Sequence, residues 1–310
     1  MSEGIVYFKS GLGNLIQATP AMQAMATLDP SGKVDVCLDS GWTHDSRIKS
    51  VEEILAACPF VDRVVRHPAQ PLGAYRYGFV PVQCETSKAG NVVLRKMRAV
   101  GWPNENWPTT GAHEVDVNMR LVSKATGYRG PIPQKFCPVF EDGPDLSGMP
   151  RPLIGICNGA FGTTVWEKKR WPYFKVLARL LKRYYGGAVV GVGAKGELND
   201  VPMDRDFGGE LSITRSARAI QQFDLLITTD TCCMHIGDAL GIRVLALFGP
   251  TLMSKNAPRS PRARMMRAAV ACAPCQYTDL FFGCNSYTCM EQLTPAAVMT
   301  EVRRTMKEAV

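Results

Sequence analysis

The stretch that most constrains the fold runs from Asp224 to Thr251 and reads DLLITTDTCCMHIGDALGIRVLALFGPT. Its apolar runs at 224–228 and 244–248 are each typical of a buried strand. The residues between them leave room for about three helical turns. Strand, short helix and strand in such a short stretch make a βαβ unit, so we expect the two strands to be parallel.

Polar residues stand where the first of these strands should turn into the helix. They are Asp230, Thr231 and His235. In parallel sheets, ligands collect at the carboxyl ends of strands, near helix N-termini that offer free N–H groups and a partial positive charge. We therefore expect this turn to be part of a binding site, although His235 alone could equally be a structural histidine.

Alternating strands and helices on both sides of a linker predict an α/β protein with two halves. Turn residues interrupt the alternation near 140–150, so we place an N-terminal domain at 1–145 and a C-terminal domain at 146–310. Each should be a Rossmann-like, doubly wound parallel sheet, and the two should face a cleft. The predicted strands are 4–8, 33–38, 62–65, 78–82, 153–157, 188–192, 224–228 and 244–248, and the predicted helices are 15–28, 51–58, 113–128, 173–185, 212–222 and 295–309.

Composition narrows the class of partner. The chain has 310 residues, 46% of them hydrophobic, which is enough for two cores. A formal net charge of +8 favours an anionic partner such as a sugar nucleotide, a glycolipid or a nucleic acid, although a merely basic surface fits as well. No stretch approaches the roughly 20 apolar residues of a transmembrane helix, and the start lacks a signal-peptide pattern, so we expect a cytoplasmic protein.

Two glycine-rich turns raise the alternative of a nicotinamide-dependent dehydrogenase. The first, 11–16, has Ile16 in place of the third glycine of the dinucleotide fingerprint. The second, 191–196, has all three glycines, but Pro202 soon follows and disfavours the long helix that the fingerprint requires. The sequence therefore argues against a nicotinamide site.

A third turn, 158–172, is typical of diphosphate binding. It reads NGAFGTTVWEKKRWP, with small residues, hydroxyls and cations between a buried strand and a helix. Hydroxyls and N–H groups can donate hydrogen bonds to a diphosphate, and a lysine adds charge. An ordinary basic loop before a surface helix would also fit. If this turn and the 230–235 turn lie at one sheet edge, a single pocket would contain Thr163, Thr164, Lys169, Asp230 and Thr231.

Four clustered cysteines form a C-x₂-C-x₈-C-x₄-C pattern. Four thiolates in a loop-like stretch predict a tetrahedral structural metal, either zinc or iron. Reduced free thiols or disulfides remain alternatives. The four residues, in the segment 272–289, are Cys272, Cys275, Cys284 and Cys289.

Several motifs together resemble glycosyltransferase family 9, the heptosyltransferase family of lipopolysaccharide synthesis. They are GLGNLIQATPAMQAM, VDRVV, HEVDVNMRLVSKATGY, KRWPYFKVLARLL and DTCCMHIGDALGIRVLALFGPT, in the family's order and over nearly the whole chain. The resemblance implies a GT-B fold, with the acceptor in the N-terminal half and a nucleotide sugar, usually ADP-heptose, in the C-terminal half. It also implies metal-independent, inverting transfer. Some protein-modifying relatives carry a Cys₄ iron site, which keeps iron open here.

The resemblance assigns roles to particular residues. Lys169 matches the lysine that contacts the diphosphate, with Thr163 or Thr164 as hydroxyl donors. Asp230, Thr231 and His235 match the phosphate and sugar site. Glu197 matches an acid on the nucleotide ribose, and Leu211 an apolar side chain on the base.

Two residues depart from the family pattern. Gly13-Asn14 stands where the family has Gly-Asp, whose aspartate is the usual catalytic base, and an amide cannot take a proton as a carboxylate does. Cys232 replaces a glycine, which leaves the backbone N–H in place. Either Asn14 only positions the acceptor, or activity has been lost, or another group is the base. The candidates for that group are Asp39, His44, Asp45 and Glu85.

We therefore predict an inverting glycosyltransferase that moves heptose from ADP-heptose to an acceptor hydroxyl in lipopolysaccharide core synthesis, without a catalytic cofactor. The acceptor should be anionic, for which a glycolipid at the inner membrane face is suitable, and the enzyme could then be peripheral to that membrane. The alternatives are a related transferase acting on a protein or a modified nucleic acid, and a sugar-nucleotide-binding protein without transferase activity.

Overall fold

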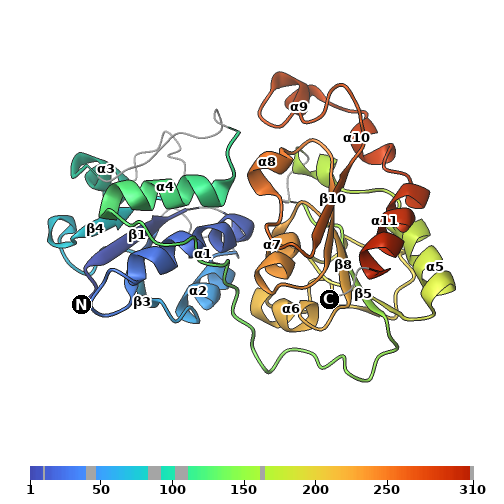
Figure 1. The fold of residues 1–310 in the computed structure, drawn as a ribbon, viewed down its shortest axis with the longest axis horizontal. Helices are drawn as coiled ribbons and strands as arrows, with labels where there is room; N and C mark the ends of the chain where they lie inside the picture. Colours follow the sequence, from blue (N-terminus) through green and yellow to red (C-terminus); the bar gives the residue numbers. More distant parts are fainter. Residues whose placement is uncertain (10, 40–46, 83–91, 102–110, 161–164, 308–310) are drawn as a thin grey trace. The chain divides into compact units, whose positions relative to one another are not determined.

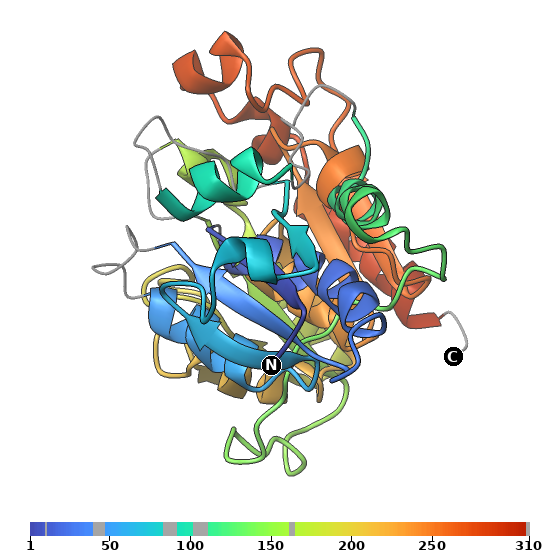
Figure 2. The same ribbon diagram turned by 90° about the vertical axis from the view of Figure 1, so that its left-hand side faces the viewer.

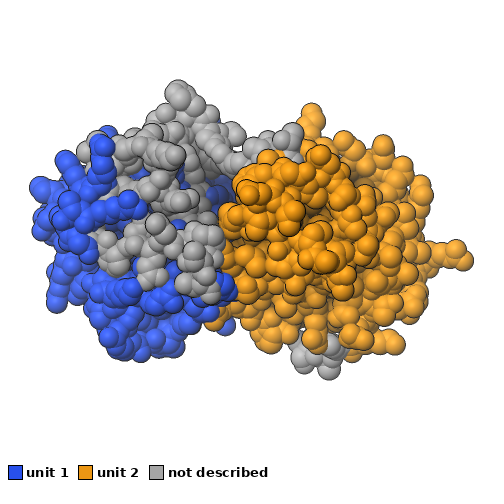
Figure 3. Space-filling model, turned by 90° about the horizontal axis from the view of Figure 1, so that it is seen from above, with its two compact units in different colours: residues 1–138 blue, residues 139–310 orange. Residues whose placement is uncertain are grey.

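The computed structural model describes residues 1–9, 11–39, 47–82, 92–101, 111–160 and 165–307. These divide into two compact units, unit 1 at Met1–Pro138 and unit 2 at Val139–Val310 (Figure 3). Among the helices of the described ranges, none is long and apolar enough to cross a membrane.

Unit 1 is built on a four-stranded parallel sheet in the order β3-β2-β1-β4 (Figure 1). Helix α1 packs against both α4 and α2, and Figure 2 shows the same elements from a second direction. The bounds are β1 Gly4–Phe8, α1 Leu12–Ala26, β2 Val34–Leu38, α2 Arg47–Ala56, β3 Val61–Val65, β4 Tyr77–Phe79, α3 Val92–Ala99 and α4 Glu114–Thr126.

Helix α1 begins earlier than the sequence suggested, and Pro20 lies in its interior. Proline lacks the N–H that would bond the carbonyl four residues back. Here the Thr19 hydroxyl donates to that carbonyl of Ile16 at 2.7 Å, and so replaces the missing bond. The helix therefore continues through Pro20. Its early start places Gly13 and Asn14 in the first helical turn.

Unit 2 is built on a six-stranded parallel sheet in the order β10-β9-β8-β5-β6-β7. Helices α5 and α11 cover one face, and α6 and α7 the other (Figure 1). The bounds are β5 Leu153–Cys157, α5 Phe174–Tyr185, β6 Ala188–Gly191, β7 Arg205–Asp206, α6 Ile213–Ile220, β8 Leu225–Thr229, α7 Cys232–Ala239, β9 Val244–Phe248, α8 Met253–Asn256, β10 Ala263–Arg267, α9 Asp279–Gly283, α10 Thr288–Glu291 and α11 Pro295–Lys307.

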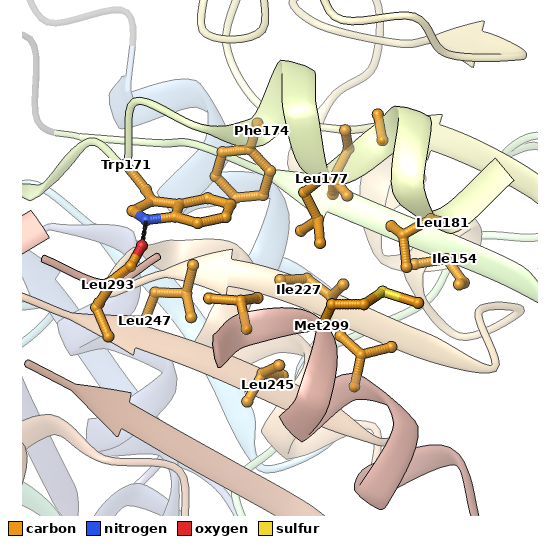
Figure 4. Packing of buried hydrophobic residues seen from close by; sticks show 14 of the residues in the cluster. Ile154, Trp171, Phe174, Leu177, Leu181, Ile227, Leu245, Leu247, Leu293 and Met299 are labelled. Carbon is orange, nitrogen blue, oxygen red and sulfur yellow. Dashed lines mark hydrogen bonds between the residues drawn. The ribbon is translucent and has the colours of Figure 1, made fainter. Parts of the chain in front are cut away.

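The core of unit 2 centres on the fully buried Trp171, just before α5. Its ring meets Phe174 edge to face at 5.1 Å between centroids, and its indole N–H donates to the Leu293 carbonyl at 2.8 Å (Figure 4). Leucines of α5 and Met299 of α11 pack onto the strands in the same cluster. The chain is therefore fixed in place immediately after the 158–170 turn.

The parallel pairing of β8 and β9 confirms the βαβ unit expected from the 224–251 stretch. The prediction from the sequence omitted β7, β10 and the helices α3, α8, α9 and α10. It also placed the domain boundary at 145/146, later than the observed division. Residues after Pro138 belong with unit 2 because they bond to it: the Leu146 N–H donates to Gln222 Oε1 at 2.8 Å, and Arg215 pairs with Asp142.

Candidate functional site

The chain order of unit 2 places a candidate site at the carboxyl ends of β5 and β8. From β5 the chain proceeds to β6 and β7 on one side, and then returns to β8, β9 and β10 on the other. Ligands of open parallel sheets bind at such a reversal of strand order. Residues 158–160 follow β5 and residues 230–231 follow β8, so the two predicted turns do lie at the same edge of the sheet.

Lys169 and Asp230 form the charged pair at this edge. Lys169 ends a short 3₁₀ turn, Trp166–Lys169, and its Nζ donates to the Asp230 carbonyl oxygen at 2.5 Å. The same Nζ lies 3.5 Å from Asp230 Oδ2, and 5.3 Å from the centre of the Trp166 ring. From the described residues, Oδ2 accepts no hydrogen bond although it is buried. A buried oxygen of this kind can accept a hydrogen bond from a proton donor on a ligand.

Asn158 fixes the position of the lysine-bearing turn, a role that the sequence reading missed. Its side-chain Oδ1 accepts from the Trp171 N–H at 2.8 Å, and its Nδ2 donates to the Trp171 carbonyl at 3.1 Å. This two-way amide pair joins the end of β5 to the start of the α5 region across the turn. The signal was present, because an asparagine directly after a buried strand is suited to such side-chain-to-backbone bonds.

Glu197 lies beside the same turn. Its Oε2 accepts from the Ala194 N–H at 3.0 Å, and its Oε1 from the Ala160 N–H at 3.4 Å. Burial raises the pKa of this carboxyl, while the N–H of Ala194 and the Arg170 charge act in the opposite direction.

Two glycines make room for Glu197. A Cβ at Gly193 would lie 2.4 Å from Glu197 Oε2, and Gly193 has φ +134°, where side chains are strained. A Cβ at Gly159 would lie 2.7 Å from Thr231 Oγ1 and 3.3 Å from Glu197 Oε2. Gly193 of the 191–196 stretch thus admits the Glu197 carboxylate, and no helix follows this stretch directly. This arrangement does not support a dinucleotide fingerprint.

Helix α7 presents its N-terminus to the same edge. Thr231 is its N-cap residue, and the Thr231 hydroxyl accepts no bond from the described N–H groups of the first turn. Cys232, at the first helical position, is partly exposed. His235 is buried on α7, and Leu211, partly exposed, precedes the N-cap of α6. Thr163 and Thr164 lie outside the described residues.

Lys168 points elsewhere, although it is the direct neighbour of Lys169. Its Nζ is buried and donates to the carbonyls of Phe281 and Phe282, at 2.5 and 3.1 Å. It also lies 5.5 Å from the centre of the Phe281 ring. Lys168 therefore holds the cysteine-rich segment, whereas Lys169 belongs to the site.

The metal centre predicted for the four cysteines of that segment stays a prediction. Among the described residues, no group of three or more histidine, cysteine or acidic side chains is arranged to hold a metal ion. Cys272 is exposed, whereas the Cys289 sulfur is buried and would lie 3.1 Å from a Cβ at Gly249. All four are free thiols. The segment packs Cys289 into the core, where burial, followed by the nearby thiols of Cys275, Cys272 and Cys284, raises its pKa to about 11.

In unit 1, the turn after the first strand, β1, brings a side-chain amide together with a carboxylate. Asn14, in the first turn of α1, donates from Nδ2 to both oxygens of Glu114, at 3.1 and 3.0 Å. Gly13 lies beside it in that turn. The sequence did not indicate Glu114, because this residue lies 100 positions from Asn14 along the chain.

Of the four alternative bases, only Asp39 lies within the described residues. It is buried after β2, accepts a hydrogen bond from the Tyr7 hydroxyl, and lies 3.5 Å from Lys9 Nζ. His44, Asp45 and Glu85 lie outside the described residues, so the identity of the base stays a prediction.

The family model of glycosyltransferase family 9 (heptosyltransferase) matches residues 85–284, which is more than half of the chain. The protein therefore belongs to this family of glycosyltransferases. Among curated proteins, it is similar to lipopolysaccharide heptosyltransferase 2 of Salmonella typhimurium, with 26% identity over 172 residues. The alignment covers 51% of this chain and 48% of that protein, so the chain spans about half the length of this relative.

Solved structures of the same kind share the fold. A glycosyltransferase family 9 protein from Veillonella parvula matches with a TM-score of 0.72 at 15% identity, covering 99% of this chain and 97% of that one. The ADP-heptose lipopolysaccharide heptosyltransferase II of E. coli matches with a TM-score of 0.68 at 17% identity, covering 98% of each chain. The two parallel-sheet units thus have the GT-B fold.

Proposed function

We propose that this protein is an inverting glycosyltransferase that transfers heptose from ADP-heptose to an acceptor hydroxyl in lipopolysaccharide core synthesis. The observation that carries the proposal is the Lys169–Asp230 pair beside the N-terminus of α7, at the reversal of strand order in unit 2. Family membership and the ADP-heptose named for the E. coli structure support the choice of donor.

In this proposal unit 2 binds the donor. Lys169 and the N-terminus of α7 bind the diphosphate, together with the hydroxyls of Thr163 and Thr164. His235 supports the same turn from α7. Glu197 accepts hydrogen bonds from the ribose hydroxyls, and Leu211 packs on the base. The glycines at 159 and 193 allow this carboxylate to lie against the turn.

The reaction is a single displacement at the anomeric carbon. The acceptor oxygen forms a bond to that carbon, the bond to the diphosphate oxygen breaks, and its electron pair leaves with ADP. The acceptor hydroxyl loses its proton, which ends in solvent. Lys169 and the α7 N–H groups stabilise the charge that develops on the leaving diphosphate, an effect worth about 3 kcal/mol per preorganised donor. No step requires a catalytic metal.

Unit 1 binds the acceptor, with Gly13 and Asn14 at the carboxyl end of β1. This turn lies where the strand order of unit 1 reverses, between β1 and β4. A phosphorylated glycolipid acceptor suits the net charge of +8. Such an acceptor would bring the enzyme to the inner face of the membrane that holds the glycolipid.

The test is transfer by the purified protein. Heptose-deficient lipopolysaccharide and ADP-heptose are incubated with it, ADP release is followed, and the mass of the glycolipid is determined. We expect ADP release that depends on the acceptor, together with a gain of one heptose. UDP- and GDP-sugars replace ADP-heptose as controls, and protein and DNA replace the glycolipid. Release with one of those acceptors instead would move the proposal to a different substrate.

A second candidate is a sugar-nucleotide-binding protein without transferase activity. The amide at Asn14 favours it, because the family aspartate is absent at that position. Binding of ADP-heptose in calorimetry, without ADP release on any of the acceptors, would select this candidate over the enzyme.

A further inference from the structure

The carboxylate of Glu114 occupies an unusual position for a charged group. Its residue is the first of α4 and is fully buried. Three amide hydrogen bonds reach it from α1: two from Asn14 Nδ2, and one of 2.9 Å from Gln17 Nε2. The partial positive charge at the N-terminus of α4 favours an ionised carboxylate there. Buried charges are costly unless they are hydrogen-bonded, so this cluster is a built feature of unit 1.

The chemistry of the cluster fixes the orientation of the Asn14 amide. An ionised carboxylate only accepts hydrogen bonds, so the NH₂ group of Asn14 must face it. The amide oxygen, Oδ1, must then point the other way. It faces the turn after β1, where a Cβ on Gly11 would lie 3.3 Å from it. Asn14 is itself only partly buried, so its oxygen is presented at the ligand-binding edge of the sheet.

We propose that Glu114 is a positioning residue, which holds Asn14 so that Oδ1 accepts the hydrogen bond of the attacking acceptor hydroxyl. This inference rests on the proposed function. The negative charge behind the amide also polarises it, because hydrogen bonds in a chain strengthen one another in a low dielectric. In this arrangement the Asn14 amide contacts the acceptor hydroxyl directly, and the Glu114 carboxylate lies behind that amide.

Replacing either member alone should disturb the pair. In Glu114→Gln, an NH₂ group replaces one acceptor oxygen and opposes the donors from Asn14 and Gln17, so the Asn14 amide loses its fixed orientation. In Asn14→Asp, the new carboxylate lies about 3 Å from that of Glu114, and two carboxylates at that distance cannot both ionise freely. The double variant reverses the pair, since the new amide can donate to the new carboxylate.

Transfer kinetics of the wild-type protein, the two single variants and the double variant test the proposal. We expect each single variant to lower kcat/KM for the acceptor by about tenfold to a hundredfold, as misplacement of a positioning group does. The KM for ADP-heptose should stay within about twofold, because the donor binds to unit 2. The double variant should recover at least half of the loss on a logarithmic scale. Losses that simply multiply in the double variant would overturn the pairing.

A buried carboxylate elsewhere in unit 1 provides the control for stability. Asp35 is fully buried in β2, accepts from Arg63 at 3.0 Å and from the Tyr75 hydroxyl at 2.9 Å, and has no role in the proposed site. Asp35→Asn should lower the melting temperature and leave kcat/KM for the acceptor unchanged. If it lowers kcat/KM as much as Glu114→Gln does, the Glu114 effect is structural and the proposal is wrong.

Side-chain amide resonances provide a readout that needs no activity. In protein labelled with ¹⁵N-asparagine and assigned with Asn14→Ala, Glu114→Gln should move the Asn14 NH₂ signals upfield as the charge-assisted bonds are lost. An unmoved signal would overturn the proposal even if the protein transfers no sugar. If the wild-type protein shows no transfer while the NMR shift occurs, the proposed function fails and the positioning contact stands.

Discussion

Two turns that follow the first strand of each sheet are built from different chemistry. After β5 in unit 2, Lys169 lies 3.5 Å from Asp230 Oδ2, next to the N-terminus of a helix. After β1 in unit 1, the Asn14 amide stands before the fully buried carboxylate of Glu114. Both turns lie where the strand order reverses, and so at the edge where ligands bind. One turn presents a cation, the other a neutral oxygen.

The difference follows from the ligand that each turn is proposed to meet. A diphosphate gains negative charge as it leaves, so a cation and a helix N-terminus act where that charge develops. An acceptor hydroxyl is neutral and needs an oriented hydrogen-bond acceptor. A charged group that orients this hydrogen-bond acceptor can be buried behind it, provided that the charged group is itself hydrogen-bonded.

The largest effect should come from removing the cation of unit 2. Lys169→Ala should lower kcat by about a hundredfold, corresponding to about 3 kcal/mol of transition-state stabilisation. The neighbouring Lys168→Ala is the matched control, because Lys168 bonds to the carbonyls of Phe281 and Phe282 instead. It should lower the free energy of unfolding by about 2 kcal/mol and leave kcat within about threefold. Equal losses of kcat in both variants would contradict the assignment. Rates and urea denaturation measure the two quantities.

The next effect concerns the support of the lysine-bearing turn. Asn158→Ala removes both hydrogen bonds to Trp171 and leaves a buried N–H without its partner. We expect a loss of about 1–3 kcal/mol in the free energy of unfolding, and weaker ADP binding by calorimetry. Asn158→Asp keeps the acceptor for the Trp171 N–H and should lose less. If ADP affinity is unchanged in Asn158→Ala, the turn does not depend on this support.

A smaller effect should appear in the pH dependence of nucleotide binding. Burial raises the pKa of Glu197, so this carboxyl takes up a proton at a higher pH than an ordinary one. Ribose hydroxyls donate better to the ionised form, so ADP affinity should fall as pH is lowered through the raised pKa. Glu197→Gln should remove this part of the profile and leave only the titration of ADP itself. Superimposable profiles for the two proteins, measured by calorimetry, would exclude Glu197 as the ribose acceptor.

The smallest effect should come from chelation. The four cysteines of 272–289 form no metal-holding group within the described part of the chain. With free thiols at all four positions, treatment with a strong chelator should leave the melting temperature unchanged, and metal analysis of the purified protein should give far less than one zinc or iron per chain. A stoichiometric metal, lost together with several degrees of melting temperature, would restore the prediction made from the cysteine spacing.

The regular part of the fold was predictable from the sequence. Buried parallel strands appear as continuous apolar runs, and β1, β5 and β9 were placed at their observed bounds. The strand β10 was missed because ARMMR has an arginine on each side of its two methionines and lies at an edge, where one side meets solvent. The start of α1 was placed too late, because glycines at 11 and 13 suggested a turn. Neither φ nor hydrogen bonding can be inferred from glycine alone.

The site was predictable where its residues follow strands, and not where they meet through the fold. Lys169, Asp230 and Thr231 could be placed at one edge from the order of elements, because parallel strands end together. The contact between Asn14 and Glu114 joins two helices far apart in sequence, and local pattern carries no signal for it. The cysteine spacing likewise could not indicate that Cys289 enters the core.

The binding of ADP to three proteins tests the division of roles between the two turns most directly. Calorimetry on the wild-type protein, Lys169→Ala and Asn14→Ala needs neither acceptor nor turnover. We predict that Lys169→Ala weakens ADP binding by about tenfold or more, as loss of a charge-assisted contact does, while Asn14→Ala binds ADP like the wild type. Weakening by Asn14→Ala with no effect of Lys169→Ala would place the nucleotide in unit 1 and contradict the account.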